Sequence, residues 1–112
     1  MAFQPLLKNP YWKSTQKIAN YAITGQDSQS GFHNLNATVN IVLTLPKAFP
    51  GLYYKFLVAA AHQITVTPKI ATDTIRGKAA GASAVNSTIG SFLSLICLVP
   101  GFWEPEINIG PW

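Results

Sequence analysis

Four carboxylic acids have the clearest capacity for acid–base chemistry in this chain: Asp27, Asp73, Glu104 and Glu106. Paired carboxylates work as general acid and base when their environments hold the two pKa values apart. Asp73 lies in "TDTIRG", where an aspartate side chain commonly accepts hydrogen bonds from nearby backbone N–H groups of a turn. Glu104 and Glu106 flank Pro105, as at an exposed corner. We therefore expect no catalytic residue among the four.

Histidine, cysteine and serine chemistry is equally sparse. His33 and His62 have no further ligand at a metal-binding spacing, so we expect no metal ion and no other cofactor. The lone Cys97 excludes an internal disulfide, and its place within "SLICLV" favours a buried, inert thiol over a nucleophile. No nucleophile-elbow motif accompanies the serines. The sequence therefore predicts a protein that is not an enzyme.

The composition indicates a surface that meets other proteins. Of the 112 residues, 48% are hydrophobic and 11% are charged, with a net charge of +4 at pH 7. An ordinary soluble domain has roughly 25% charged residues. The basic residues do not form the concentrated basic face that nucleic-acid binding requires; they are Lys8, Lys13, Lys17, Lys47, Lys55, Lys69, Arg76 and Lys78. We expect protein partners and no nucleic acid.

Residues 79–103 contain no charged side chain, which raises the question of a membrane-spanning segment. Polar residues and the Pro100-Gly101 pair interrupt this stretch. Its continuous apolar part, residues 92–99, has the length of a strand, whereas a spanning helix needs roughly 20 apolar residues. The N-terminus, "MAFQPLLKNPYWK", lacks the apolar core of a signal peptide. We therefore expect no membrane contact.

Alternation with a period of two predicts β-strands along most of the chain. It is clearest in residues 35–45, "LNATVNIVLTL", where every odd position is apolar. Similar patterns predict strands at residues 18–24, 52–58, 64–67, 91–99 and 106–110. Glycines at 77, 81 and 90 favour a loop over residues 77–87. The expected fold class is all-β: a small antiparallel β-sandwich or jelly-roll-like barrel of about six or seven strands.

The strand expected at residues 91–99 is apolar on both faces. One face carries Leu93, Leu95 and Cys97, and the other carries Phe92 and Ile96. In a small antiparallel sandwich one face of a sheet meets water, so the second apolar face needs a cover. We expect the first face to lie in the core. The face with Phe92 and Ile96 should lie in a subunit contact or beneath the N-terminal segment.

A succession of motifs gives the chain a family resemblance. In chain order they are the Leu45-Pro46 turn, the aromatic-rich strand 51–58, "ITVTP" at 64–68, the Asp-x-Ile-x-Gly turn 73–77, and the Gly-x-Trp of 101–103. Over roughly residues 35–112 the chain resembles a β-rich module of tailed-bacteriophage virion proteins. Such modules occur at the ends of tail fibres and in small proteins that decorate and clamp phage capsids.

The resemblance implies a function without catalysis, because known members tend to be trimers that carry no catalytic site. It implies a homotrimer on the capsid exterior, made in the host cytoplasm, with the major capsid protein as its partner. A chain of this length leaves no room for a fibre shaft, so we expect a decoration (cement) protein. The alternative is a tail-fibre tip or another receptor- or sugar-binding module. There Trp103 and Trp112 would stack on sugar rings, although both rings could instead pack the end of the barrel.

Residues 1–17 are predicted to form an extended arm ahead of a single sandwich domain of residues 18–112. Pro5 and Pro10 favour extended backbone, and apolar, aromatic and basic side chains alternate without a helix or strand period. An extended arm can add a strand to the sheet edge of a neighbour. The expected arm residues in capsid or subunit contacts are Phe3, Leu6, Leu7, Lys8, Tyr11, Trp12 and Lys13.

Overall fold

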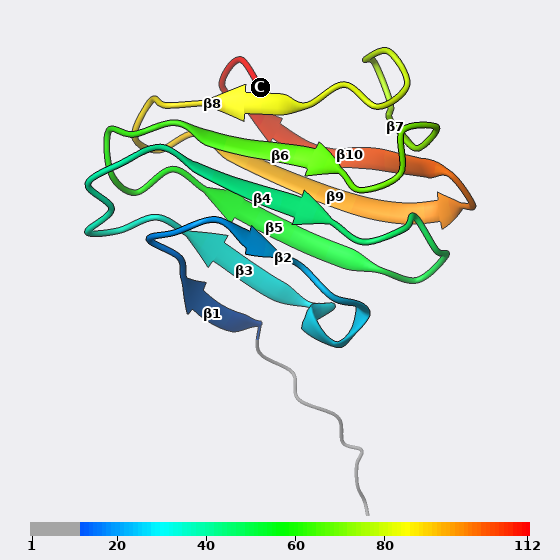
Figure 1. Cartoon of the computed structure of the whole chain (residues 1–112), viewed down its shortest axis with the longest axis horizontal. Helices are drawn as coiled ribbons and strands as arrows, with labels where there is room; N and C mark the ends of the chain where they lie inside the picture. Colours follow the sequence, from blue (N-terminus) through cyan, green and yellow to red (C-terminus); the bar gives the residue numbers. More distant parts are fainter. Residues whose placement is uncertain (1–11) are drawn as a thin grey trace, which may run out of the picture.

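The computed structural model describes residues 12–112, which form a two-layered β-sandwich (Figure 1). The large sheet has the order β1-β3-β5-β9-β10-β7, and the small sheet has the order β2-β4-β6-β8. The elements are β1 Lys13–Gln16, β2 Tyr21–Ala22, the 3-10 turn η1 Gly25–Asp27, β3 Ser30–His33, β4 Ile41–Leu45, β5 Tyr53–Leu57, β6 Ile64–Pro68, β7 Thr74–Ile75, β8 Ala84–Asn86, β9 Phe92–Val99 and β10 Phe102–Ile109. The predicted all-β sandwich is confirmed. No helix in the described part of the chain is long and apolar enough to cross a bilayer.

The first six strands alternate between the two sheets, and within each sheet these strands run parallel to one another. In the large sheet β1 pairs with β3 and β3 with β5, while in the small sheet β2 pairs with β4 and β4 with β6. The chain thus winds around the core in successive coils. Strands β8 and β9 then add antiparallel to β6 and β5, and β10 pairs antiparallel with β9 and parallel with β7.

Both sheets are therefore mixed, and the prediction of an antiparallel sandwich is wrong in this respect; a jelly-roll path is not confirmed. A period of two tells which side of a strand is buried, but it is the same for parallel and antiparallel neighbours. The number of strands was also underestimated. Strands as short as β2 and β7 carry too few residues to show an alternation.

The core lies between the sheets, and the alternation predicted most of it. In β4 the side chains of Ile41, Leu43 and Leu45 are fully buried. On β9 the predicted inner face is confirmed, because Leu93, Leu95 and Cys97 are buried. The burial of a whole aliphatic side chain stabilises the folded state by about 1.5–3 kcal/mol. This face of β9 therefore belongs to the main source of stability.

Two local patterns were misread. The strand predicted from residue 35 begins only at Ile41, because Asn36 adopts a positive φ of 68° in a turn closed by the Ala37 N–H, which donates to Asn34 O. The loop predicted over residues 77–87 contains strand β8, whose Ala84 is buried against the core. Tertiary packing outweighs the local glycine signal there.

The boundary expected after residue 17 also needs correction. Strand β1, which lies within the predicted arm, pairs in register with β3 and forms the edge of the large sheet. Residues 13–16 are therefore part of the body. The other expected arm contacts, at Phe3, Leu6, Leu7, Lys8 and Tyr11, lie outside the described residues.

Candidate functional site

A row of side chains crosses the outward face of the large sheet. In register across four neighbouring strands it consists of His33, Leu57, Phe92 and Ile109, which we call the outer row. Leu57 and Ile109 are exposed, and His33 and Phe92 are half-buried. A sheet face that meets only water is usually polar. The outer row is therefore a candidate surface for contact with another protein.

A hollow of about 170 Å³ lies beside the outer row, between it and strand β1. Its lining includes Trp12, Gly31, Lys55 and Phe92, and we call it the outer groove. Gly31 pairs with Ser14 on one side and Lys55 on the other, and its missing side chain leaves the floor open. A Cβ at Gly31 would be 3.8 Å from Lys13 O, an ordinary contact, so the space is real.

Trp12 forms one wall of the outer groove and is held by its own chain. Its ring meets Tyr53 edge-on with centroids 4.7 Å apart, and Lys55 Nζ lies 4.1 Å from the indole centroid. Contacts of these two kinds typically contribute about 0.5–1.5 kcal/mol each. The arm was expected to contact a neighbour instead of its own body, and at Trp12 the structure shows contact with the body. Lys13, also expected in the arm contact, is exposed and lines the groove.

Asn34 fixes the backbone behind the outer row. Its side chain is fully buried, and Oδ1 accepts the N–H groups of Ala59 and Ala60 at 2.7 and 2.9 Å. Its Nδ2 donates to the carbonyl oxygens of Ala60 and His62 at 3.2 and 3.1 Å. All four hydrogen bonds that an asparagine amide offers are made. The end of β3 is thereby locked to the loop after β5, which holds His33 level with Leu57.

The two contact residues predicted outside the arm, Phe92 and Ile96, lie on the outward face of β9 as expected. Phe92 lines the outer groove, and Ile96 is a half-buried outward residue between Tyr53 of β5 and Glu104 of β10. The contact of these two side chains with a subunit or with the N-terminal segment stays a prediction.

The prediction that Trp103 stacks on sugar rings is wrong. This ring is fully buried and packs against Tyr54 with centroids 5.8 Å apart, so no sugar reaches it. Trp112 is half-buried against the core, and its Nε1 donates to Ile109 O. The two tryptophans pack the sandwich, as the other interpretation of these rings proposed.

The titratable groups of the body serve structure. Asp73 is buried and accepts the N–H of Ala48 at 2.8 Å, so it joins two loops 25 residues apart instead of closing only its own turn. Burial raises the pKa of the Cys97 thiol, as expected for an inert cysteine. In residues 12–112 no cluster of His, Cys, Asp or Glu is placed to hold a metal ion.

The lining of the outer groove suits apolar and aromatic groups, and Lys13 and Lys55 can bind a carboxylate at its rim. Sequence reasoning missed Gly31 at the floor of the outer groove, Asn34 behind the outer row and Ile109 within that row. The apolar alternation of "EINI" was the only signal available for Ile109. A scan against family models gave no match for this chain, and a search of curated proteins found no significant relative.

Proposed function

We propose that this protein is a non-enzymatic virion structural protein of a tailed phage, a capsid decoration protein that trimerises and clamps capsid subunits. The observation that carries the proposal is the outer row, in which Leu57, Phe92 and Ile109 form an apolar strip beside His33 on the outward face of the large sheet. An exposed apolar patch of this kind marks a protein interface more often than a catalytic site.

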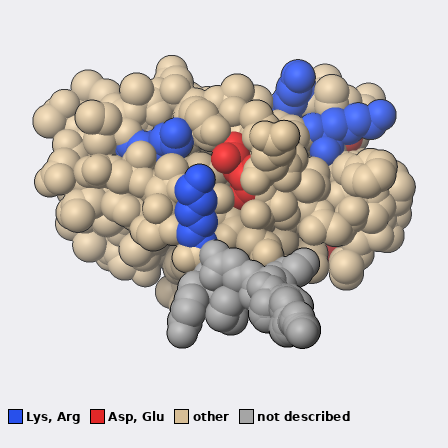
Figure 2. All heavy atoms as spheres, turned by 90° about the horizontal axis from the view of Figure 1, so that it is seen from below, with Lys and Arg blue, Asp and Glu red and all other residues tan. Residues whose placement is uncertain are grey.

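The sparse charge supports the same proposal. On the side of the molecule drawn in Figure 2, most of the surface carries no Lys, Arg, Asp or Glu. A surface poor in charge loses little hydration when it is covered by protein, so its burial favours assembly. The capsid location and the trimeric state in this proposal rest on the family resemblance over residues 35–112. The sugar-binding alternative loses Trp103 as a stacking ring, because that side chain is buried.

Purified particles provide the first test. We expect imaging or mass counting to find the chain on the outside of the capsid, and light scattering to find a trimer in solution. A monomer at all concentrations together with a tail location would overturn the proposal.

The groove provides the second test, because Gly31 can be filled without unfolding the protein. Gly31→Val should keep the melting temperature near that of the parent protein while weakening trimer formation or capsid binding. Thr65→Val, on the outward face of the small sheet, is the matched control and should assemble normally. Normal assembly of Gly31→Val would show that the groove is not covered in the complex.

A further inference from the structure

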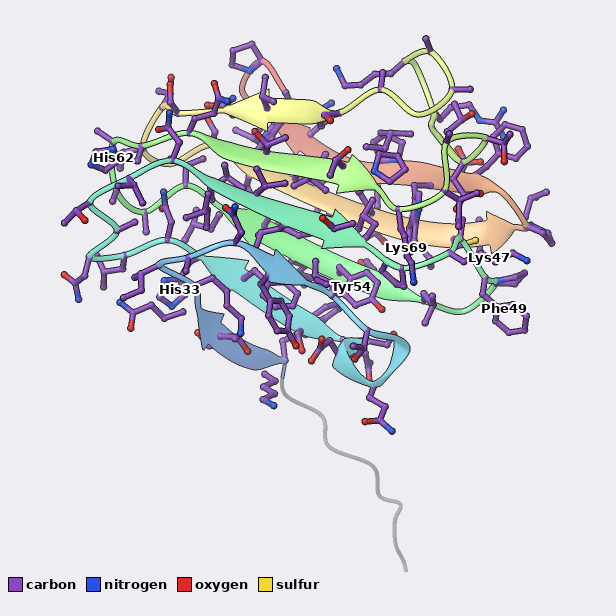
Figure 3. The ribbon with its side chains drawn as sticks, in the orientation of Figure 1. His33, Lys47, Phe49, Tyr54, His62 and Lys69 are labelled. Carbon is purple, nitrogen blue, oxygen red and sulfur yellow. The ribbon has the colours of Figure 1, made fainter. Side chains whose placement is uncertain are left out.

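One end of the small sheet contains a hollow that the outer groove does not reach. Strands β2, β4 and β6 are parallel, so their C-terminal ends meet there. The hollow has a volume of about 380 Å³, and its lining includes Thr24, Thr44, Lys47 and Lys69. Figure 3 places both lysines toward the end of the molecule opposite His33 and His62. Two lysines and two threonines therefore line one hollow, and the Thr24 hydroxyl already donates to Asp27.

The two lysines lie on adjacent strand ends. Lys69 follows β6, and its N–H donates to Leu45 O at 3.1 Å, while Lys47 comes two residues after Leu45. Both lysines are exposed and carry the same charge, so an anion at the hollow would be attracted by both. Within residues 12–112 neither lysine has an ion-pair partner, and the ion pair that this part of the chain does form joins Arg76 to Glu104. The hollow therefore offers an anion two positive charges that are unpaired within the described residues.

An apolar tip stands beside the hollow. Phe49, Leu98 and Val99 are 67%, 64% and 49% exposed. Hydrogen bonds from Gly51 N to Cys97 O (2.9 Å) and from Gly101 N to Ala48 O (3.2 Å) hold the two turns together. The tip is thus a fixed apolar feature, and Figure 3 shows Phe49 close to Lys47 at this end.

We propose that this end binds an acidic segment of another protein, with carboxylates in the Lys47–Lys69 hollow and an apolar side chain against Phe49 and Leu98. Charge complementarity favours an anionic partner. The recess favours a protein over a bilayer, because Lys47 and Lys69 line a hollow and a protruding carboxylate can enter it. The inference does not depend on a phage origin or on the outer row.

A peptide titration tests this proposal on the full chain. The probe is a short synthetic peptide rich in Glu with flanking Leu, and its matched control has Gln at each Glu. We expect the acidic peptide to shift the backbone amide resonances of Thr44, Lys47 and Phe49, and the Gln peptide to leave them unchanged. Because charge-assisted hydrogen bonds are lost, the double variant Lys47→Ala/Lys69→Ala should bind about tenfold or more weakly.

Two further variants separate charge from contact. Lys17→Ala removes one positive charge before β2, at a residue that does not line the hollow, and should keep the affinity of the parent protein. Phe49→Ser should weaken binding while leaving the melting temperature unchanged, because the ring is exposed. Equal binding by the double lysine variant would overturn the proposal. So would lysine-dependent binding to phosphatidylglycerol vesicles without binding to the peptide, which would assign the site to lipid.

Discussion

The two faces of strand β9 have similar hydrophobicity and different surroundings. Toward the small sheet, Leu93, Leu95 and Cys97 are enclosed by the core. Toward the outside, Phe92 and Ile96 are half-buried, with a serine between them whose hydroxyl donates to Glu106. The inner face is completed by this chain alone, whereas the outer face is covered at Ser94 and remains partly exposed at Phe92 and Ile96. An apolar face therefore indicates that a strand is to be buried, and the tertiary structure shows which apolar faces are covered by the chain itself.

The largest effect should come from the inner face. Leu95→Ala should lower the free energy of unfolding by about 2–5 kcal/mol, because it leaves a cavity in a packed core. Denaturant unfolding of the isolated protein measures this. Leu98→Ala on the same strand is the control and should change the free energy by less than about 0.5 kcal/mol, because Leu98 is exposed. Similar losses for both variants would contradict the distinction between the faces.

The next effect concerns the support of the outer row. Asn34→Ala leaves buried backbone groups of the loop after β5 without partners and should cost about 1–3 kcal/mol. Asn40→Ala is a suitable control, because the Asn40 side chain accepts a single exposed hydrogen bond, from Gln63 N–H. We expect hydrogen exchange at Ala59 and Ala60 to accelerate in the first variant alone. Unchanged hydrogen exchange at these two residues would show that the Asn34 side chain does not hold the loop behind the outer row.

The outer face should respond in assembly more than in folding. Ile96→Asp should lower the free energy of unfolding by about 1 kcal/mol, since Ile96 is half-buried on the outward face and such a position tolerates polar residues better than the core does. A charge desolvated in an interface is strongly penalised, so the same variant should lose the oligomer. Circular dichroism and sizing measure the two effects. If Ile96→Asp unfolds as readily as Leu95→Ala, the outer face is internal to the subunit and the comparison fails.

The smallest effect is a pH dependence near η1, away from both faces of β9. Partial burial alone would raise the pKa of Asp27, but hydrogen bonds from Thr24 N–H, Tyr21 OH and Thr24 Oγ1 outweigh it and hold this pKa below its usual value. Because the pKa of Asp27 is lower in the folded than in the unfolded protein, the ionised carboxylate stabilises the fold at pH values above its unfolded pKa. This stabilisation disappears as the pH falls below about 4.

Asp27 remains partly exposed, so its contribution should be under about 1 kcal/mol. Asp27→Asn should therefore be slightly less stable than the parent protein at neutral pH. The two proteins should converge in acid, as melting curves at several pH values will show. A difference that grows in acid would mean that the carboxylate is destabilising.

The sequence alone predicted those features of the fold that depend on residues close together in the chain. Residues two apart share a face of a strand, so alternation alone assigned Ile41, Leu43 and Leu45 to the core and separated Leu95 from Ile96. The Asn36 turn was missed because an asparagine with positive φ leaves the apolar alternation of residues 35–45 unchanged.

Strand partners and their consequences were decided by the tertiary structure. The parallel winding, the burial of Trp103, and the alignment of His33, Leu57, Phe92 and Ile109 all join residues far apart in the chain. The Lys47–Lys69 hollow likewise exists only because β4 and β6 end side by side. The chain determines locally which side chains turn inward. Which strands then meet depends on how the whole set of apolar faces is buried at once, and no single segment carries that information.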